Sequence, residues 1–142
     1  MPSMSLSELA CGLADIPSSL AAAPICDITL DSRQVTTGAG FIAIQGAQTD
    51  GRRFIPDALE RGAAVVLAEP FEAFDLGPRV VTVPDLKSHL GELTKRFYAD
   101  PSAQLALLAV TGTNGKTSIS DYIGQLLRLL GESAGTIGTL GA

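Results

Sequence analysis

An apolar run that turns through glycines into a lysine most constrains the fold of this chain. The stretch LALLAVTGTNGKTS spans residues 105–118. Its apolar half, Leu105–Val110, predicts a buried strand, and the periodic apolar residues after the turn predict a helix over Lys116–Leu130. Gly131 is placed to end that helix. A strand, a glycine-rich turn and a helix in this order predict an α/β unit.

The same turn is suited to hold a phosphate. Several backbone N–H groups converge where a strand turns through glycines into a helix, at the positive end of the helix dipole. Lys116 can reach a terminal phosphate, and the Thr117 hydroxyl can ligate Mg²⁺. The standard pattern G-x-x-x-x-G-K-[ST] is incomplete, because Val110 stands where its first glycine is expected and the loop glycine is Gly112. A turn that binds nothing is the alternative, but folding alone does not explain the lysine after Gly115.

The residues before this unit alternate short strands and helices. Strands are predicted over 25–30, 41–46, 63–69 and 80–83, and helices over 6–13, over 54–61 and from Asp85 onward. Ser5 and Glu8 fit a capping box, and Gly62 is placed to end the second helix. The continuous apolar run at 63–69 is typical of a strand covered on both faces. The polar stretch Ala99–Gln104 predicts a domain boundary.

Composition excludes several classes of protein. The chain is 46% hydrophobic and 18% charged, as in globular proteins, and its net charge of −5 argues against general nucleic-acid binding. Cys11 and Cys26 predict reduced thiols rather than a disulfide framework. His89, the single histidine, lacks the companions of a metal site. Because no apolar run approaches the roughly 18 residues of a membrane span, we expect a cytoplasmic protein.

The motif VTGTNGKTS resembles the ATP-binding loop of the Mur ligase family, the ATP-dependent amide-forming enzymes that build the peptide of bacterial peptidoglycan. Residues 29–69, RFYADPS at 96–102 and GTIGTLG at 135–141 resemble the branch that adds the third residue. The resemblance implies a mixed α/β, UDP-MurNAc-peptide-binding domain in residues 1–100. Residues 105–142 are then the start of a Rossmann-like, ATP-binding central domain.

The family's site residues carry over by position. Contacts to the uridine nucleotide fall on Leu30, Ser32, Ala47, Gln48 and Thr49. The ATP cradle falls on Gly112, Thr113, Asn114, Gly115, Lys116, Thr117 and Ser118. In this assignment Lys116 is catalytic, since it stabilises charge on the transferring phosphoryl group, and Thr117 holds Mg²⁺.

Two segments keep a second interpretation. LDSR, residues 30–33, also fits a strand-ending turn in which Asp31 and Ser32 bond the backbone. Residues 50–53, DGRR, fit either a phosphate-binding turn or a solvated loop, and charge alone favours the loop.

The resemblance implies an ATP-dependent ligase that adds a diamino acid, meso-diaminopimelate or L-lysine, to UDP-MurNAc-L-Ala-D-Glu through an acyl phosphate. Its partners are that dipeptide substrate, ATP with Mg²⁺ and the diamino acid. The alternatives are the D-Ala-D-Ala-adding ligase of the same family and a non-catalytic UDP-sugar-binding module. Family members have three domains, so we expect these 142 residues to be an N-terminal fragment. The fragment is expected to be inactive alone and to self-associate, whereas the full-length enzyme is expected to be a monomer.

Overall fold

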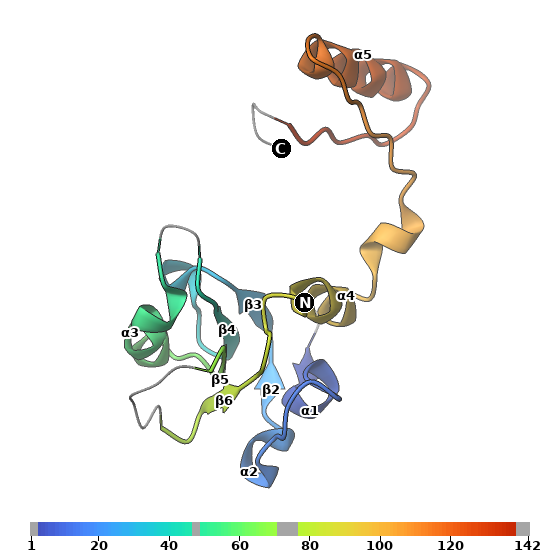
Figure 1. The fold of residues 1–142 in the computed structure, drawn as a ribbon. Coiled ribbons are helices and arrows are strands. Elements are labelled where there is room, and N and C mark those ends of the chain that lie inside the picture. The colour runs from blue at the N-terminus through green and yellow to red at the C-terminus, as the bar shows by residue number, and fades with distance from the viewer. Residues whose placement is uncertain (1–2, 47–48, 71–76, 139–142) are drawn as a thin grey trace. The chain divides into compact units, whose positions relative to one another are not determined.

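The computed structural model describes residues 3–46, 49–70 and 77–138. The chain divides into two compact units, Met1–Gln104 and Leu105–Ala142, which are described separately (Figure 1).

A four-stranded parallel sheet forms the centre of the first unit, and its spatial order is the chain order, β3-β4-β5-β6. The strands are β3 (Asp27–Thr29), β4 (Ala39–Ala43), β5 (Val65–Ala68) and β6 (Val80–Thr82). In this register Ile28 pairs with Gly40, while Leu67 lies between Ile42 and Val81. Parallel strands bring their carboxyl ends to one edge of the sheet.

Both faces of the sheet are covered, as the apolar run at 63–69 predicted. Along β5, Val65 and Leu67 pack into a cluster with side chains of α1 (Leu6–Leu9) and α4 (Leu90–Phe97). Val66 and Ala68 face the opposite way, toward α3 (Ile55–Glu60). All four β5 residues are at most 1% exposed, and burial of each larger side chain stabilises the fold by about 1.5–3 kcal/mol.

The N-terminal segment confirms the predicted capping box. Ser5 caps α1 by accepting a hydrogen bond from the Glu8 N–H, and its own N–H donates to the Glu8 carboxylate at 3.0 Å. The helix is shorter than predicted and ends at Leu9. The chain then turns, and Gly12 adopts a left-handed conformation. Strand β1 (Met4–Ser5) pairs antiparallel with β2 (Pro24–Ile25).

Several boundaries differ from the sequence-based expectation. The predicted strand over 25–30 is interrupted at Cys26, and the serine- and alanine-rich segment predicted as a loop contains α2 (Ser18–Ala21). Helix α4 begins at Leu90 rather than Asp85, because Asp85 has a left-handed φ of 51° and turns precede the helix.

The connections contain 3-10 helices: η1 (Ser32–Gln34), η2 (Gly51–Phe54) and η3 (Pro101–Gln104). Gly62 follows α3 with a φ of 95°, as predicted.

The second unit contains one of its two predicted elements. Helix α5 (Lys116–Leu129) forms, and Gly131 follows it with a φ of 87°. The predicted strand over Leu105–Val110 is wrong, since these residues are irregular and all but Val110 are exposed, with Leu107 90% exposed. Among the described residues none pairs with this segment, and an apolar sequence becomes a strand only when a neighbour satisfies its backbone groups.

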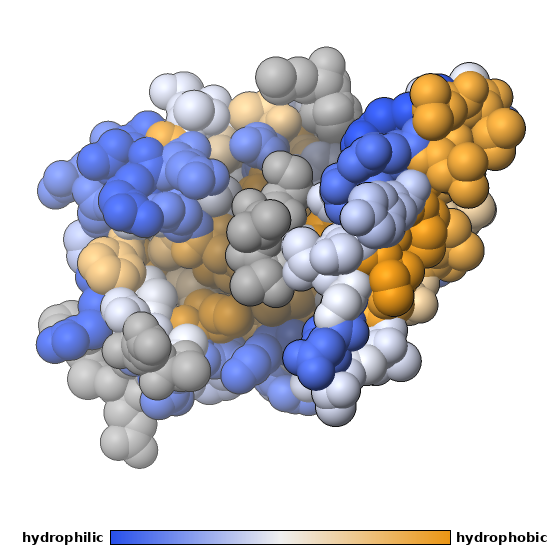
Figure 2. Space-filling model, turned by 90° about the horizontal axis from the view of Figure 1, so that it is seen from above, coloured by the Kyte–Doolittle hydropathy of each residue, from blue (hydrophilic) through white to orange (hydrophobic). Residues whose placement is uncertain are grey.

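Most of the exposed large apolar side chains belong to the second unit. They include Ile119 and Leu126 on α5 and Leu107 before the turn. Exposed apolar side chains gather in one region of the face drawn in Figure 2. Within the described residues, no helix combines the length and the apolarity that a membrane crossing requires.

Arg96 joins α4 to the C-terminal end of α1. Its guanidinium donates to the backbone oxygens of Leu9 at 3.1 Å and Cys11 at 2.7 Å, and it pairs with Glu92. Carbonyl groups at a helix end have no partner within the helix. Arg96 therefore satisfies acceptors that are far from it in sequence, and its side chain is only 27% exposed.

Arg96→Ala is expected to lower the free energy of unfolding by about 1–3 kcal/mol, because two backbone acceptors, one of them part-buried, lose their charged donor. Arg61→Ala is the matched control, since Arg61 forms the same i,i+4 type of ion pair with Asp57 but is 46% exposed. The control is expected to cost at most about 0.5 kcal/mol. Urea unfolding of both variants measures the difference, and equal losses would contradict the assignment.

Candidate functional site

The carboxyl edge of the parallel sheet collects polar and exposed residues. Leu30 and Ser32 follow β3, Gln45 follows β4, and Glu69 follows β5. In open α/β sheets, ligands bind outside the carboxyl ends of the strands. This edge is therefore the candidate binding site of the first unit.

The segment after β3 is a turn with one exposed and one buried candidate. Leu30 is 53% exposed, whereas Ser32 is 6% exposed. The pKa of the Asp57 carboxyl on α3 is lowered, and hydrogen bonding by the Ser32 side chain is the main cause. Ser32 thus acts on a side chain within the protein.

Asp31 does bond the backbone, as the strand-ending turn interpretation expects. It caps η1 by accepting the Arg33 N–H at 3.0 Å, and it also accepts two bonds from the Arg33 guanidinium, at 2.9 and 2.7 Å. The side-chain bonds from Arg33 are the main reason that the pKa of Asp31 falls to about 2.

The segment after β4 forms a tight turn. Gln45 and Asp50 form an isolated bridge, and the Gly46 N–H donates to the Thr49 oxygen at 3.0 Å. A Cβ at position 46 would lie 2.7 Å from that oxygen, so glycine is required there by close approach. Thr49 is exposed and lies at the candidate edge. The other two candidates of this segment, Ala47 and Gln48, lie outside the described residues.

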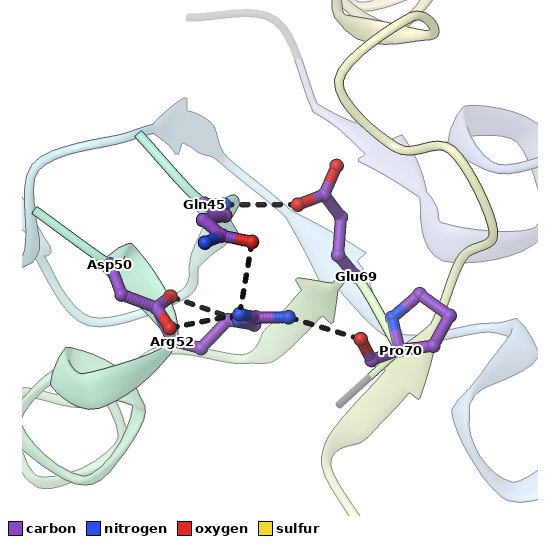
Figure 3. A network of polar contacts seen from close by, with 5 residues as sticks. All are labelled: Gln45, Asp50, Arg52, Glu69 and Pro70. Carbon is purple, nitrogen blue, oxygen red and sulfur yellow. Dashed lines mark hydrogen bonds and ion pairs between the residues drawn. The ribbon is translucent and has the colours of Figure 1, made fainter. Parts of the chain in front are cut away.

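In the DGRR segment, Arg52 forms its bonds within the protein. Its side chain is 12% exposed and forms a bidentate ion pair with Asp50, which lowers the pKa of that carboxyl. It also donates to the Pro70 oxygen at 3.0 Å (Figure 3). Asp50 and the Pro70 oxygen therefore hold the Arg52 guanidinium, whereas Arg53 is exposed.

In the second unit, the glycine-rich turn has the backbone of an anion site. Gly115 is the N-cap of α5 with a left-handed φ of 77°, and Gly112 has a φ of 151°. No side chain caps the helix, so its first N–H groups, from Lys116 to Ser118, are directed to solvent at the positive end of the dipole. The rest of the predicted cradle, Thr113 and Asn114, is exposed as well.

Lys116 lies over its own loop. Its ammonium donates to the backbone oxygen of Gly112 at 2.6 Å and to that of Thr113 at 3.4 Å. The side chain is exposed, as is that of Thr117. A flexible lysine in this position can exchange two carbonyl partners for a phosphate oxygen, and these residues therefore fit a nucleotide phosphate with Mg²⁺.

Comparison with known proteins identifies the family. Residues 24–98, more than half of the chain, match the family model described as "Mur ligase family, catalytic domain". The chain belongs to the Mur ligase family. Residues 110–142 of this Mur ligase chain match the Mur ligase middle domain.

Several curated relatives bear the name UDP-N-acetylmuramoyl-L-alanyl-D-glutamate–2,6-diaminopimelate ligase. The chain is 44% identical over 133 residues to the Haemophilus ducreyi protein, covering 83% of this chain and 26% of that protein. It is 48% identical over 120 residues to the Pseudomonas aeruginosa protein, covering 82% of this chain and 25% of that protein. This Mur ligase chain spans about a quarter of the length of the curated relatives it matches.

Solved structures agree with this assignment. A structure of a 2,6-diaminopimelate ligase of the same name matches with a TM-score of 0.66 and 33% identity, covering 92% of this chain and 26% of that one. MurF from Acinetobacter baumannii matches with a TM-score of 0.65 and 26% identity, covering 90% of this chain and 28% of the MurF chain. The mixed α/β fold predicted from the sequence is confirmed.

Sequence reasoning missed the polar network behind the candidate edge. Asp50 pairs with Arg52, Arg52 donates to the Pro70 oxygen, and Glu69 accepts the Gln45 N–H. The sequence shows only charged residues near strand ends. The arginine directly after an Asp-Gly turn was the available signal. Charge counting cannot separate a solvated arginine from one that is buried against backbone oxygens.

Ser32→Ala is expected to raise the pKa of Asp57 toward its ordinary value of 3.8, because the main hydrogen bond to the carboxylate is lost. The wild-type carboxylate stabilises the fold above pH 3.8, and this contribution disappears as the pH falls through the lowered pKa. Titration of the Asp57 carboxyl carbon by NMR measures the change, with exposed Ser102→Ala as the control. Identical Asp57 titrations in wild type and Ser32→Ala would contradict the bond.

Proposed function

We propose that this chain belongs to an ATP-dependent ligase that adds 2,6-diaminopimelate to UDP-MurNAc-L-Ala-D-Glu. The observation that carries the proposal is the 44–48% identity, across both units, to relatives that bear this name. Residues 1–100 form the UDP-MurNAc-peptide-binding domain, and residues 105–142 belong to the ATP-binding domain. The partners are the UDP-MurNAc-dipeptide, ATP and the diamino acid, and the cytoplasm is the expected compartment.

On the nucleotide-sugar side, the carboxyl edge binds the uridine nucleotide. Leu30 and Thr49 are exposed at this edge, and Ser32 fixes the turn between β3 and η1. Ala47 and Gln48 complete the proposed contacts. An edge with few free cations suits recognition of a uracil by backbone groups, a hydroxyl and an amide.

On the ATP side, the N–H groups of the glycine-rich turn and of the first turn of α5 bind phosphate oxygens. The cradle consists of Gly112, Thr113, Asn114, Gly115, Lys116, Thr117 and Ser118. Bound ATP supplies the phosphoryl group that activates a carboxylate of the D-Glu residue as an acyl phosphate. Lys116 is the catalytic residue, because its ammonium stabilises the charge that develops on the transferring group. The Thr117 hydroxyl holds Mg²⁺.

The second candidate is a D-Ala-D-Ala-adding ligase of the same family. One MurF structure matches the fold almost as well, with a TM-score of 0.65 against 0.66. Its sequence identity to this chain is lower, 26% against 33%, and the names of the curated relatives favour diaminopimelate. Those names also favour diaminopimelate over L-lysine.

The test uses a chimera in which residues 1–142 replace the corresponding quarter of the Haemophilus ducreyi relative. The chimera is expected to form the amide between UDP-MurNAc-L-Ala-D-Glu and 2,6-diaminopimelate with release of phosphate. Lys116→Ala is expected to lower kcat at least about a hundredfold, since a preorganised charge is lost from the transition state. Lys95→Ala, which removes an exposed lysine on α4, is the matched control and keeps the parent rate.

Full amide synthesis by Lys116→Ala would refute the catalytic assignment. The 142-residue chain alone is expected to bind UDP-MurNAc-L-Ala-D-Glu without turning over ATP. Binding of this kind, combined with an inactive chimera, would instead favour a non-catalytic UDP-sugar-binding module.

A further inference from the structure

Arg52 is a half-buried cation behind the candidate edge. Its side chain is 12% exposed, whereas those of Arg61 and Arg33 are 46% and 82% exposed. A buried guanidinium is costly unless its donors are satisfied. Here each of its three nitrogens donates within the protein, to a carboxylate, to a backbone oxygen and to a side-chain amide.

These bonds tie together segments that are separate in sequence. Asp50, the N-cap of η2, accepts two bonds at 2.9 Å, and the Pro70 oxygen after β5 accepts one at 3.0 Å. The Gln45 side-chain oxygen after β4 lies at 3.5 Å (Figure 3). A planar guanidinium fork can reach several acceptors at fixed angles, which an ammonium cannot do.

Glu69 strengthens the same arrangement from the end of β5. One of its carboxylate oxygens accepts the Gln45 N–H at 3.0 Å (Figure 3). The other accepts the Lys87 N–H at 3.4 Å. Gln45 is thus held both through its backbone and through its side chain. Side chains therefore connect the ends of β4 and β5 beyond their last paired residues, Ala43 and Ala68.

Backbone bonds fix Gly46 and Gly51 next to this network. The Gly51 N–H donates to the Ile44 oxygen at 2.9 Å, and a Cβ at position 51 would lie 2.8 Å from that atom. The Gly46 N–H bonds the Thr49 oxygen. Gln45 and Thr49 are exposed, so the network of Arg52 and Glu69 supports residues that form part of the surface.

We propose that Arg52 is a positioning residue for nucleotide-sugar recognition: it sets the geometry of Gln45 and Thr49 without touching the ligand. The inference rests on the proposed function of the carboxyl edge. Direct phosphate binding by Arg52 is disfavoured, because it would break a bidentate ion pair and a backbone bond. Positioning from behind leaves every observed bond intact.

Arg52→Ala and Arg52→Lys test this role in the 142-residue chain. Both are expected to weaken binding of UDP-MurNAc-L-Ala-D-Glu by about 10- to 100-fold, since a supporting hydrogen-bonded shell is lost. The lysine variant keeps the charge but not the fork. Lys95→Ala, which removes a cation from an exposed ion pair with Asp100, is the control and keeps the wild-type affinity. Isothermal titration calorimetry gives the affinities.

Amide hydrogen exchange without ligand supplies a readout that general unfolding does not reproduce. Both Arg52 variants are expected to speed exchange at Gly46 and Gly51, while Val66 and Leu67 in β5 stay as protected as in the wild type. Unchanged exchange at Gly46 and Gly51 overturns the role of Arg52. If Arg52→Ala does not fold, Arg52→Lys is judged by the same criteria.

The two proposals fail in different ways. Lack of binding by the wild-type chain overturns the proposed function of the edge, and the exchange experiment still decides what Arg52 holds. Wild-type binding that survives both Arg52 variants at full affinity overturns only the positioning role.

Discussion

Burial of β5 on both of its faces is the interaction on which the first unit depends. Val65 and Leu67 face α1 and α4, while Val66 and Ala68 face α3. The strand also pairs on both sides, with β4 and β6. A strand with these contacts has no solvated side, so its register and direction set those of its neighbours. The sheet is parallel, and helical segments lie in the β3–β4 and β4–β5 connections.

The candidate binding edge is a consequence of that order. Parallel strands end together, so the residues after β3, β4 and β5 meet although they are far apart in sequence. Backbone groups at strand ends have lost their sheet partners and need others. Arg52 and Glu69 provide them, since they bond the Pro70 oxygen and the N–H groups of Gln45 and Lys87. The same polar groups that satisfy the sheet also shape an exposed surface for a ligand.

The two units differ in what their candidate sites require. The glycine-rich turn needs only local backbone geometry, because Gly115 supplies a left-handed N-cap and α5 supplies its own N–H groups. Lys116 reaches the turn from the first residue of that helix. The carboxyl edge instead needs a complete sheet behind it. Within the described residues, the segment 105–110 has no strand partner and stays irregular, yet the turn after it still forms.

The sequence by itself determined the features that arise within a few residues: the Ser5–Glu8 capping box, the glycines after α3 and α5, the two-sided apolar run of β5 and the turn that begins α5. Each depends on local hydrogen bonds, on backbone conformation or on apolar periodicity. Only the tertiary structure decided that Ser32 acts on Asp57, that Arg52 is half-buried behind the edge and that Leu105–Val110 is not a strand. Those outcomes depend on partners from distant segments, and no local pattern encodes which acceptor or strand will be near.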